Sequence, residues 1–151
     1  MRPPPAFLSR AARGDLPGLL EIERDAAPLP WSAAHFEAEL EVGGPLVLRG
    51  REGVLAFCAP QLVREEVYVR NLAVRTGWRR RGLGLRLLEL TLTLARRSGA
   101  SRAVLEVRAG NVPARALYEK AGFGLCGRRA GGYTSPPEEA LVLERDLAGC
   151  S

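Results

Sequence analysis

Residues 74–84 read VRTGWRRRGLG, a basic loop with glycines that separates two regular segments. The apolar stretch Val67–Val74 before it is typical of a strand, and a leucine-rich stretch begins after it at Leu83. Glycine lets backbone N–H groups approach an anion closely, and the first turn of a helix adds unpaired donors and a partial positive charge. The loop therefore predicts a site for a pyrophosphate group.

The same pattern has a structural alternative. A row of solvated arginines followed by a helix that starts at glycine would look alike, because short glycine motifs are weak signals. The loop matches neither the G-x-x-x-x-G-K-[ST] pattern of nucleoside-triphosphate sites nor the G-x-G-x-x-G turn of dinucleotide sites. Further evidence has to come from the rest of the chain.

The stretch Leu83–Arg97 fits two kinds of secondary structure. Part of it alternates like a strand, but its leucines also fall on one helical stripe, with polar residues on the opposite face. The stretch is long for a strand, and Arg96 and Arg97 before Gly99 suit the end of a helix. We therefore predict a helix.

The rest of the chain alternates between strands and helices. The predicted elements are a strand at Phe7-Leu8, a helix from Gly14-Asp15 to before Pro28, a helix capped by Ser32 and ended by Gly43-Gly44, a hairpin of Leu46–Leu48 and Val54–Ala59, a strand at Val67–Val74, the helix Leu83–Arg97, a strand at Ala103–Arg108, a helix capped by Asn111 and ended by Gly122, and strands at Leu125–Arg128 and Leu141–Leu143. This order predicts a mixed α/β fold with one sheet layer between helices.

Length and composition indicate one folded domain. The chain has 151 residues, of which 46% are hydrophobic and 26% charged. We expect a single domain over residues 1–151, with flexible ends at 1–5 and 148–151. The chain has no apolar stretch of about 18 residues and no signal-peptide pattern, so we expect a cytoplasmic protein without a membrane partner.

Cysteine and histidine usage argues against disulfide and metal sites. The cysteines, Cys58, Cys126 and Cys150, are three in number and far apart, which is no disulfide framework. His35 is the sole histidine, so no zinc-binding spacing exists, and we expect no metal. Its default interpretation is an ordinary surface or hydrogen-bonded histidine. Two of the cysteines fall in predicted strands.

The charge of the chain favours an anionic partner. The net charge is +5, and 22 residues are basic, of which only Lys120 is a lysine. A basic surface attracts a nucleotide cofactor, RNA or an acidic peptide alike. Charge alone does not choose among these partners.

The order of motifs along the chain is more specific than any one of them. The pattern Arg79-x-x-Gly82-x-Gly84 follows the strand that ends in Asn71-Leu72-Ala73-Val74, and then come Leu105–Arg108, Asn111 and the stretch Ala116–Phe123. This succession resembles the GCN5-related N-acetyltransferase superfamily, and within it the bacterial ribosomal-protein-alanine N-acetyltransferases. The resemblance runs from Glu65 to the last strand, with a weaker echo at Pro30-Trp31-Ser32 and Phe36.

The resemblance implies a fold and a co-substrate. The fold is a mixed, mostly antiparallel sheet of about six or seven strands with about four helices, splayed where the cofactor arm enters. The co-substrate is acetyl-CoA. The resemblance assigns its pyrophosphate to backbone N–H groups of Arg79, Arg80, Arg81, Gly82, Leu83 and Gly84. It assigns the pantetheine arm to the strand Leu72, Ala73 and Val74, one of whose N–H groups polarises the thioester.

The resemblance also implies catalytic residues. Glu106 matches the position of the general base, Tyr118 that of the general acid, and Asn111 a residue that contacts the cofactor or the tyrosine. The chemistry agrees, since a protein N-terminal amine has a pKa of about 8 and must lose a proton before it attacks. A carboxylate accepts that proton directly or through water, and holding both reactants together makes a covalent enzyme intermediate unnecessary.

Alternatives stay open for these residues. Glu106 also fits an exposed polar position on a strand, and Glu66 is a rival base, because some members of the superfamily carry the base on the preceding strand. Tyr118 also fits a core position, since apolar residues share its helical face.

The acceptor is the least determined part of the resemblance. It points to the N-terminal amine of a protein, an alanine of a ribosomal protein in particular, with Trp31 and Tyr133 as substrate-binding residues. Arg75-Thr76 replaces the usual Asp-Pro, and the glycine-rich loop before Tyr133 keeps one tyrosine where the resembled enzymes have two. Alternative acceptors are a small-molecule amine or a lysine.

An alternative of another class is a non-catalytic basic module that binds RNA or the ribosome. The predicted strands lack recognisable RNA-binding aromatic residues, so no direct contact with nucleic acid is expected.

Overall fold

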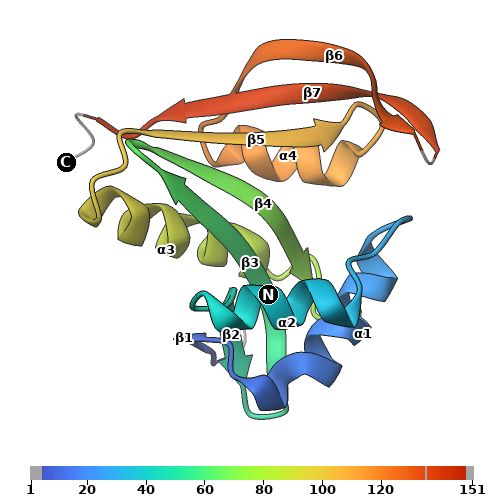
Figure 1. Ribbon diagram of the computed structural model, residues 1–151, viewed down its shortest axis with the longest axis vertical. Helices are drawn as coiled ribbons and strands as arrows, with labels where there is room; N and C mark the ends of the chain where they lie inside the picture. The colour runs from blue at the N-terminus through green and yellow to red at the C-terminus, as the bar shows by residue number, and fades with distance from the viewer. Residues whose placement is uncertain (1–4, 135, 149–151) are drawn as a thin grey trace. The chain divides into compact units, whose positions relative to one another are not determined.

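The computed structural model describes residues 5–134 and 136–148. Its elements are β1 (Phe7–Arg10), α1 (Leu16–Ala26), α2 (Ala33–Glu41), β2 (Leu46–Gly50), β3 (Gly53–Val63), β4 (Glu66–Val74), α3 (Leu83–Arg97), β5 (Arg102–Arg108), α4 (Val112–Lys120), β6 (Gly124–Thr134) and β7 (Pro137–Asp146), shown in Figure 1. A short 3-10 turn, Arg13–Asp15, precedes α1. The order of helices and strands is the predicted one, and Leu83–Arg97 is a helix as expected.

The predicted fold class is confirmed. The seven strands form a mixed, mostly antiparallel open sheet in the order β1-β2-β3-β4-β5-β7-β6. The parallel pair, β4 with β5, joins Glu66–Tyr68 to Arg102–Val104, so the pairing stops well before the end of either strand. Among the described residues, no helix is both long and apolar enough to cross a membrane. The predicted flexible ends fall mostly outside the described residues.

The chain forms two compact units. The first comprises the residues up to Ala59 together with Asn71–Leu90, and the second comprises Pro60–Arg70 together with the residues from Thr91 onward. The strands β3 and β4 and the helix α3 each contribute to both units.

The first unit has a core of helices on strands. One cluster of buried apolar side chains joins α1 and α2 to strands β2–β4, and its members are Leu19, Ile22, Phe36, Val47, Val54, Phe57 and Ala73. Spacings of three and four residues place the buried side chains of α1 on one face. In α2, the Ser32 hydroxyl accepts a hydrogen bond from the His35 amide, so the predicted cap is confirmed. Burying each large side chain contributes about 1.5–3 kcal/mol.

The second unit is built on β5, β7 and β6. In β5, Ala103, Val104, Leu105 and Val107 are buried, as expected of a strand covered on both faces. Tyr118 of α4 packs edge-on against Phe123, with ring centroids 5.9 Å apart. Cys58 lies in β3 and Cys126 in β6, both as thiols, so the predicted strand positions are confirmed; Cys150 is outside the described residues.

The C-terminal hairpin differs from its prediction. The strands were expected at 125–128 and 141–143, with residues 130–133 in a loop; instead β6 runs through them to Thr134. The register shifts between Arg129 and Tyr133, which pair with Ala140 and Glu138. A Cβ on Gly132 would lie 2.5 Å from that of Ala140, so glycine is needed there. Main-chain pairing with β7 makes this stretch a strand although its side chains lack strand periodicity.

An ion pair fastens the start of α1 to β2. Both carboxylate oxygens of Asp15 accept hydrogen bonds from Arg49, each at 2.8 Å, and Oδ2 also accepts one from the Ala12 amide. The hydrogen bonds from Arg49 hold the pKa of Asp15 below its ordinary value, although burial acts in the opposite direction. The carboxylate therefore stabilises the fold at neutral pH.

We expect Asp15→Asn to lower the free energy of unfolding by about 1–3 kcal/mol at pH 7, because charge-assisted hydrogen bonds are lost. A carboxyl whose pKa is lowered on folding stabilises above its unfolded pKa of about 3.9 and loses this contribution as pH falls through its folded pKa. The difference between variant and wild type should therefore shrink in urea titrations repeated toward about pH 2.

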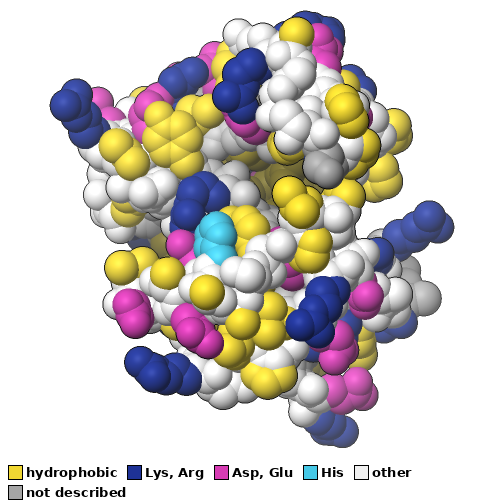
Figure 2. All heavy atoms as spheres, turned by 45° about the vertical axis from the view of Figure 1, so that its right-hand side comes forward, with side chains coloured by type: hydrophobic (Ala, Val, Ile, Leu, Met, Phe, Trp, Pro, Cys, Tyr) yellow, Lys and Arg dark blue, Asp and Glu magenta, His cyan; other side chains and the backbone are white. Residues whose placement is uncertain are grey.

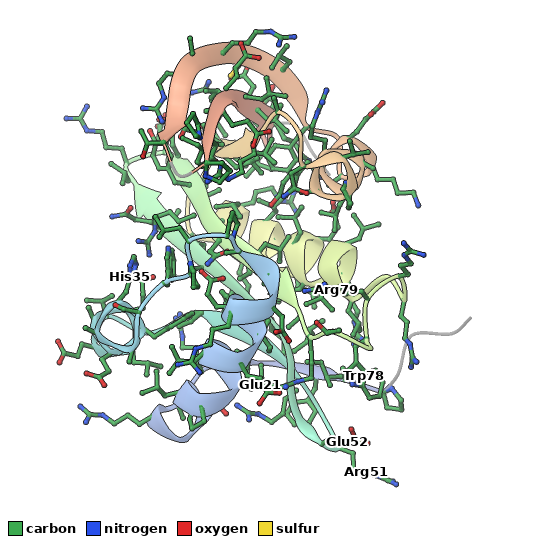
Figure 3. The ribbon with its side chains drawn as sticks, turned by 90° about the vertical axis from the view of Figure 1, so that its right-hand side faces the viewer. Glu21, His35, Arg51, Glu52, Trp78 and Arg79 are labelled. Carbon is green, nitrogen blue, oxygen red and sulfur yellow. The ribbon has the colours of Figure 1, made fainter. Side chains whose placement is uncertain are left out.

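The control is Glu52→Gln, in the turn between β2 and β3, where the carboxylate is exposed (Figure 3). That variant should stay within about 0.5 kcal/mol of wild type at every pH. An equally small effect of Asp15→Asn at pH 7 would contradict the assigned role of Asp15.

Candidate active site

The loop between β4 and α3 has a backbone that few sequences adopt. Gly77 and Gly82 have φ values of +92° and +78°, and Arg80 has a φ of +63°. A non-glycine residue in the left-handed region costs about 1–2 kcal/mol, and such strain gathers at binding loops. The surrounding contacts therefore have to hold this loop in place.

The first turn of α3 has amides without helical hydrogen-bond acceptors, and there is free space beside it at Gly82. The Arg86 amide donates to the Gly82 carbonyl at 3.0 Å, so the amides of the first turn have no acceptor one turn earlier. A Cβ on Gly82 would meet no atom within 4 Å, and Gly82 is exposed, whereas Leu83 and Gly84 are buried. An open helix start beside three consecutive arginines fits the diphosphate group of a nucleotide cofactor.

The side chain of Arg79 holds the loop rather than extending from it (Figure 3). Its Nε donates to the Val74 carbonyl at 3.1 Å, and its Nη2 donates to the Asp25 carbonyl at 3.4 Å. The guanidinium of Arg81 lies over the Trp78 ring, 4.7 Å from the centroid. The loop is thus tied to the end of β4 and to the last turn of α1.

Arg75, at the position where the resembled family usually has aspartate, strengthens the same attachment. Its Nε donates to the Val54 carbonyl at 2.9 Å, its amide donates to the Leu55 carbonyl at 2.7 Å, and its guanidinium pairs with Glu21. These bonds tie the loop to β3 and to α1. The departure from the family pattern is thus compensated by an arginine that anchors the main chain.

The strand before the loop is formed as predicted. Ala73 is buried in the core of the first unit, whereas Leu72 and Val74 are half-buried. Because side chains alternate along a strand, Leu72 and Val74 share the face opposite to Ala73. The pairing of this strand with a pantetheine arm stays a prediction.

Trp31 contributes to an aromatic cluster in the first unit. Its ring stacks on His35 with centroids 3.8 Å apart and meets the buried Phe36 edge-on. Figure 2 shows the sole histidine at the surface beside apolar side chains. Trp31 is half-buried, so one part of it belongs to the core and another stays accessible.

In the second unit, Glu106 is exposed within a buried strand. Its neighbours Leu105 and Val107 are buried, whereas its side chain is 40% exposed. One of its oxygens, Oε2, accepts a hydrogen bond from Arg129 at 2.7 Å. An exposed carboxylate in an apolar strand is what a proton acceptor for an incoming amine requires.

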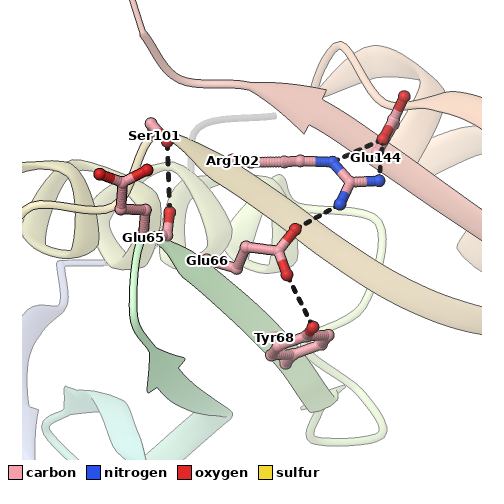
Figure 4. Close-up of polar contacts among 6 residues, drawn as sticks. All are labelled: Glu65, Glu66, Tyr68, Ser101, Arg102 and Glu144. Carbon is pink, nitrogen blue, oxygen red and sulfur yellow. Dashed lines mark hydrogen bonds and ion pairs between the residues drawn. The ribbon is translucent and has the colours of Figure 1, made fainter.

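Glu66, the rival base, is engaged through both oxygens (Figure 4). Tyr68 donates to its Oε1 at 2.8 Å, and Arg102 bridges its Oε2 to Glu144. The pKa of Glu66 is lowered, mainly by the hydrogen bond from Tyr68 and next by that from Arg102. The hydrogen bond between Tyr68 and Glu66 in turn raises the pKa of Tyr68. The network makes Glu66 a weaker proton acceptor, and the choice between Glu66 and Glu106 as the base stays a prediction.

Tyr133 lies in a charged cluster that the sequence did not reveal. The guanidinium of Arg108 lies 4.3 Å from its ring centroid and 3.5 Å from Glu138. The pKa of Tyr133 is raised, mainly by burial and next by the negative charge of Glu106. No spacing pointed to Arg108, Arg129 or Glu138, because it is the pairing of β5 and β6 with β7 that brings them near Tyr133 and Glu106.

Asn111 and Tyr118 are placed by α4. The Asn111 side chain accepts a hydrogen bond from the Ala114 amide at 3.3 Å, which confirms the predicted cap. Tyr118 is 8% exposed, so its ring packs as the core alternative expected. Catalytic roles for both residues stay predictions. Within the described residues, no group of three or more histidine, cysteine or acidic side chains could hold a metal ion.

Comparison with known proteins gives one consistent family. The model of the acetyltransferase (GNAT) family matches residues 16–123. The [ribosomal protein bS18]-alanine N-acetyltransferase of Escherichia coli K12 is 35% identical over 134 residues, which cover 85% of this chain and 89% of that protein.

Two solved structures show the same fold. The crystal structure of the ribosomal-protein-S18-alanine N-acetyltransferase from Escherichia coli has a TM-score of 0.85 and 31% identity and covers 97% of both chains. Arabidopsis thaliana NAA60 in complex with acetyl-CoA has a TM-score of 0.85 at 19% identity and covers 94% of this chain and 99% of that chain. At that identity the second likeness concerns the fold alone.

We expect Gly82→Asp to weaken acetyl-CoA binding by roughly tenfold to a thousandfold, because a new carboxylate within about 4 Å repels the diphosphate by about 1–4 kcal/mol. Gly82→Ala strains the backbone without adding charge, so it should weaken binding less. Isothermal titration calorimetry with acetyl-CoA measures both.

The matched control is Gly99→Asp, after the end of α3. Gly99 has a φ of +105° and open space in front of it, so this substitution imposes the same kind of strain and charge. Unchanged affinity in Gly82→Asp, or equal losses in both aspartate variants, would refute the assignment of the loop.

Proposed function

We propose, from the premise that this chain belongs to the acetyltransferase (GNAT) family, that it transfers the acetyl group of acetyl-CoA to the α-amine of a protein N-terminus. Membership in this family makes the chain an N-acetyltransferase, so the alternative of a non-catalytic RNA-binding module is set aside. The observation that carries the proposal is the exposed Glu106 carboxylate in an otherwise buried strand.

The chain's own residues perform distinct tasks in this proposal. Acetyl-CoA supplies a thioester whose acyl carbon is attacked by a neutral amine. The amides of residues 79–84 bind the diphosphate at the open start of α3, and the strand Leu72–Val74 orients the pantetheine arm. These contacts hold one reactant in place, which removes much of the barrier of a reaction between two molecules.

Proton transfer is assigned to two side chains. The Glu106 carboxylate accepts a proton from the acceptor ammonium, directly or through water, so that the amine becomes a nucleophile. Its ion pair with Arg129 is exposed, and an incoming ammonium can exchange it at a cost of about 0–1 kcal/mol. The hydroxyl of Tyr118 donates a proton to the departing sulfur. Asn111 orients Tyr118 or the cofactor from the start of α4.

For the acceptor, we propose an N-terminal alanine of a ribosomal protein, in the cytoplasm. The support is the 35% identity to an enzyme named for alanine acetylation of ribosomal protein bS18, over 89% of that enzyme. Trp31 and Tyr133 are the residues proposed to contact the acceptor, since each presents an aromatic ring that is partly accessible.

Glu106→Gln should lower kcat by at least about a hundredfold, because general base catalysis contributes about 10²–10⁴. The affinity for acetyl-CoA should not change, and the pH dependence of kcat should. Steady-state kinetics with an acceptor peptide, together with calorimetry for acetyl-CoA, measure these quantities.

Glu66→Gln is the matched control, since it removes the rival carboxylate while leaving Glu106 in place. This variant should keep most of its turnover. Full activity in Glu106→Gln would remove Glu106 from the mechanism, and a large loss in Glu66→Gln alone would make Glu66 the base.

The acceptor is tested by mass spectrometry after incubation with acetyl-CoA. Peptides with a free N-terminal alanine should gain one acetyl group, whereas the same peptides with a blocked N-terminus and an internal lysine should gain none. Replacing the first residue of each peptide maps the preference for alanine. Acetylation of the lysine peptides or of a polyamine, with the alanine peptides unmodified, would establish the alternative acceptor instead.

A further inference from the structure

A buried carboxylate lies in the first unit, outside the machinery described so far. Glu23 of α1 is 2% exposed. Its Oε2 accepts hydrogen bonds from the Trp31 amide at 2.9 Å and from the Asn71 side chain at 3.0 Å. Its Oε1 is buried and, among the described residues, has no hydrogen-bond partner.

Such a group is a poor way to stabilise a core. An apolar side chain of similar size would avoid the desolvation of a carboxylate, and the neighbouring buried residues of α1, Leu19 and Ile22, are apolar. The unpartnered oxygen adds to the penalty. What the carboxylate does achieve is a connection, because one oxygen joins two segments that are 40 positions apart in the sequence, at Trp31 and Asn71.

Both connected segments carry residues of the proposed site. Asn71 immediately precedes the strand Leu72–Val74, which is assigned to the cofactor arm. The ring of Trp31 stacks on His35, and Trp31 is one of the two residues proposed to contact the acceptor. Glu23 therefore joins the acceptor side of the site to the cofactor strand within one unit.

We propose that Glu23 is a positioning residue that sets where the Trp31–His35 pair stands relative to the strand Leu72–Val74, and thereby orients the acceptor amine. The inference rests on the proposed function. Glu23 touches neither reactant in this proposal, and it acts through the main chain of Trp31 and the side chain of Asn71.

Loss of Glu23 should affect the acceptor and the cofactor differently. The phosphate loop has anchors of its own, from Arg79 to Val74 and Asp25 and from Arg75 to Val54 and Glu21, and none of them uses the side chain of Glu23. Loss of Glu23 should therefore disturb the binding and orientation of the acceptor and leave the affinity for acetyl-CoA unchanged.

Two substitutions of Glu23 separate the role of its hydrogen bonds from the role of its charge. In Glu23→Gln, a single amide oxygen with two lone pairs can still accept from both donors. In Glu23→Ala, both donors lose their acceptor and stay buried. A positioning role predicts that glutamine restores function and alanine does not.

The experiment compares Glu23→Ala, Glu23→Gln and Leu19→Ala with wild type, at a temperature where all are folded. Leu19 is fully buried on the same helix and has no polar side-chain atom, so its truncation removes packing without removing a hydrogen bond and is a control for lost stability. Steady-state kinetics with an alanine peptide give kcat and KM, and calorimetry gives the affinity for acetyl-CoA. Hydrogen–deuterium exchange reports on the Trp31 amide without depending on activity.

In Glu23→Ala we expect kcat/KM for the peptide to fall by about tenfold to a hundredfold, since small misplacements cause losses of this size. Exchange at the Trp31 segment should accelerate, and acetyl-CoA affinity should be unchanged. Leu19→Ala and Glu23→Gln should keep kcat/KM within about threefold of wild type.

Three results would overturn the proposal: Glu23→Ala kinetics that match those of Leu19→Ala, a Glu23→Gln variant as defective as Glu23→Ala, or unchanged exchange at Trp31 in Glu23→Ala. If wild type acetylates no alanine peptide, the proposed function fails instead. Hydrogen exchange then decides by itself whether Glu23 holds Trp31.

Discussion

The open main chain where β4 passes into α3 is the constraint on which the site depends. A diphosphate needs amides without partners, and a helix start supplies them only when the preceding residues do not cover it. Here Arg80 and Gly82 adopt left-handed backbone conformations, which direct the preceding chain away from the amides at the start of α3. The resulting strain is offset by arginine side chains that bind main-chain carbonyls of neighbouring elements. The positive charges of the loop therefore serve its shape as well as its ligand.

The burial and hydrogen-bond partners of each glutamate also determine what its carboxylate can do. Glu66 is saturated by Tyr68 and Arg102 and is thereby a poor proton acceptor. Glu106 keeps solvent access and one weak partner, so it can exchange that partner for an ammonium. Glu23 is buried and bound to two donors on separate segments, which suits it to connecting them. The three glutamates thus differ in what they can do because their surroundings differ.

Much of this could be predicted from local patterns. The helix Leu83–Arg97, the caps at Ser32 and Asn111 and the order of elements all depend on residues close together in sequence. The assignment of a diphosphate to residues 79–84 stays a prediction. The extent of β6 could not be predicted, because Gly131 and Gly132 are typical of a loop, and it is the pairing of Arg129 and Tyr133 with β7 on either side of them that continues the strand.

The sequence by itself determined the family and the element order, since helix periodicity, capping and the succession of motifs are properties of neighbouring residues. Only the tertiary structure decided that Arg129 and Tyr133 join Glu106, that Glu66 is tied up, and that Glu23 links Trp31 to Asn71. Apart from the contact between Glu66 and Tyr68, which are two positions apart, these contacts join residues separated by 8 to 48 positions. The strand register and helix packing that bring these residues together leave no periodic pattern in the sequence.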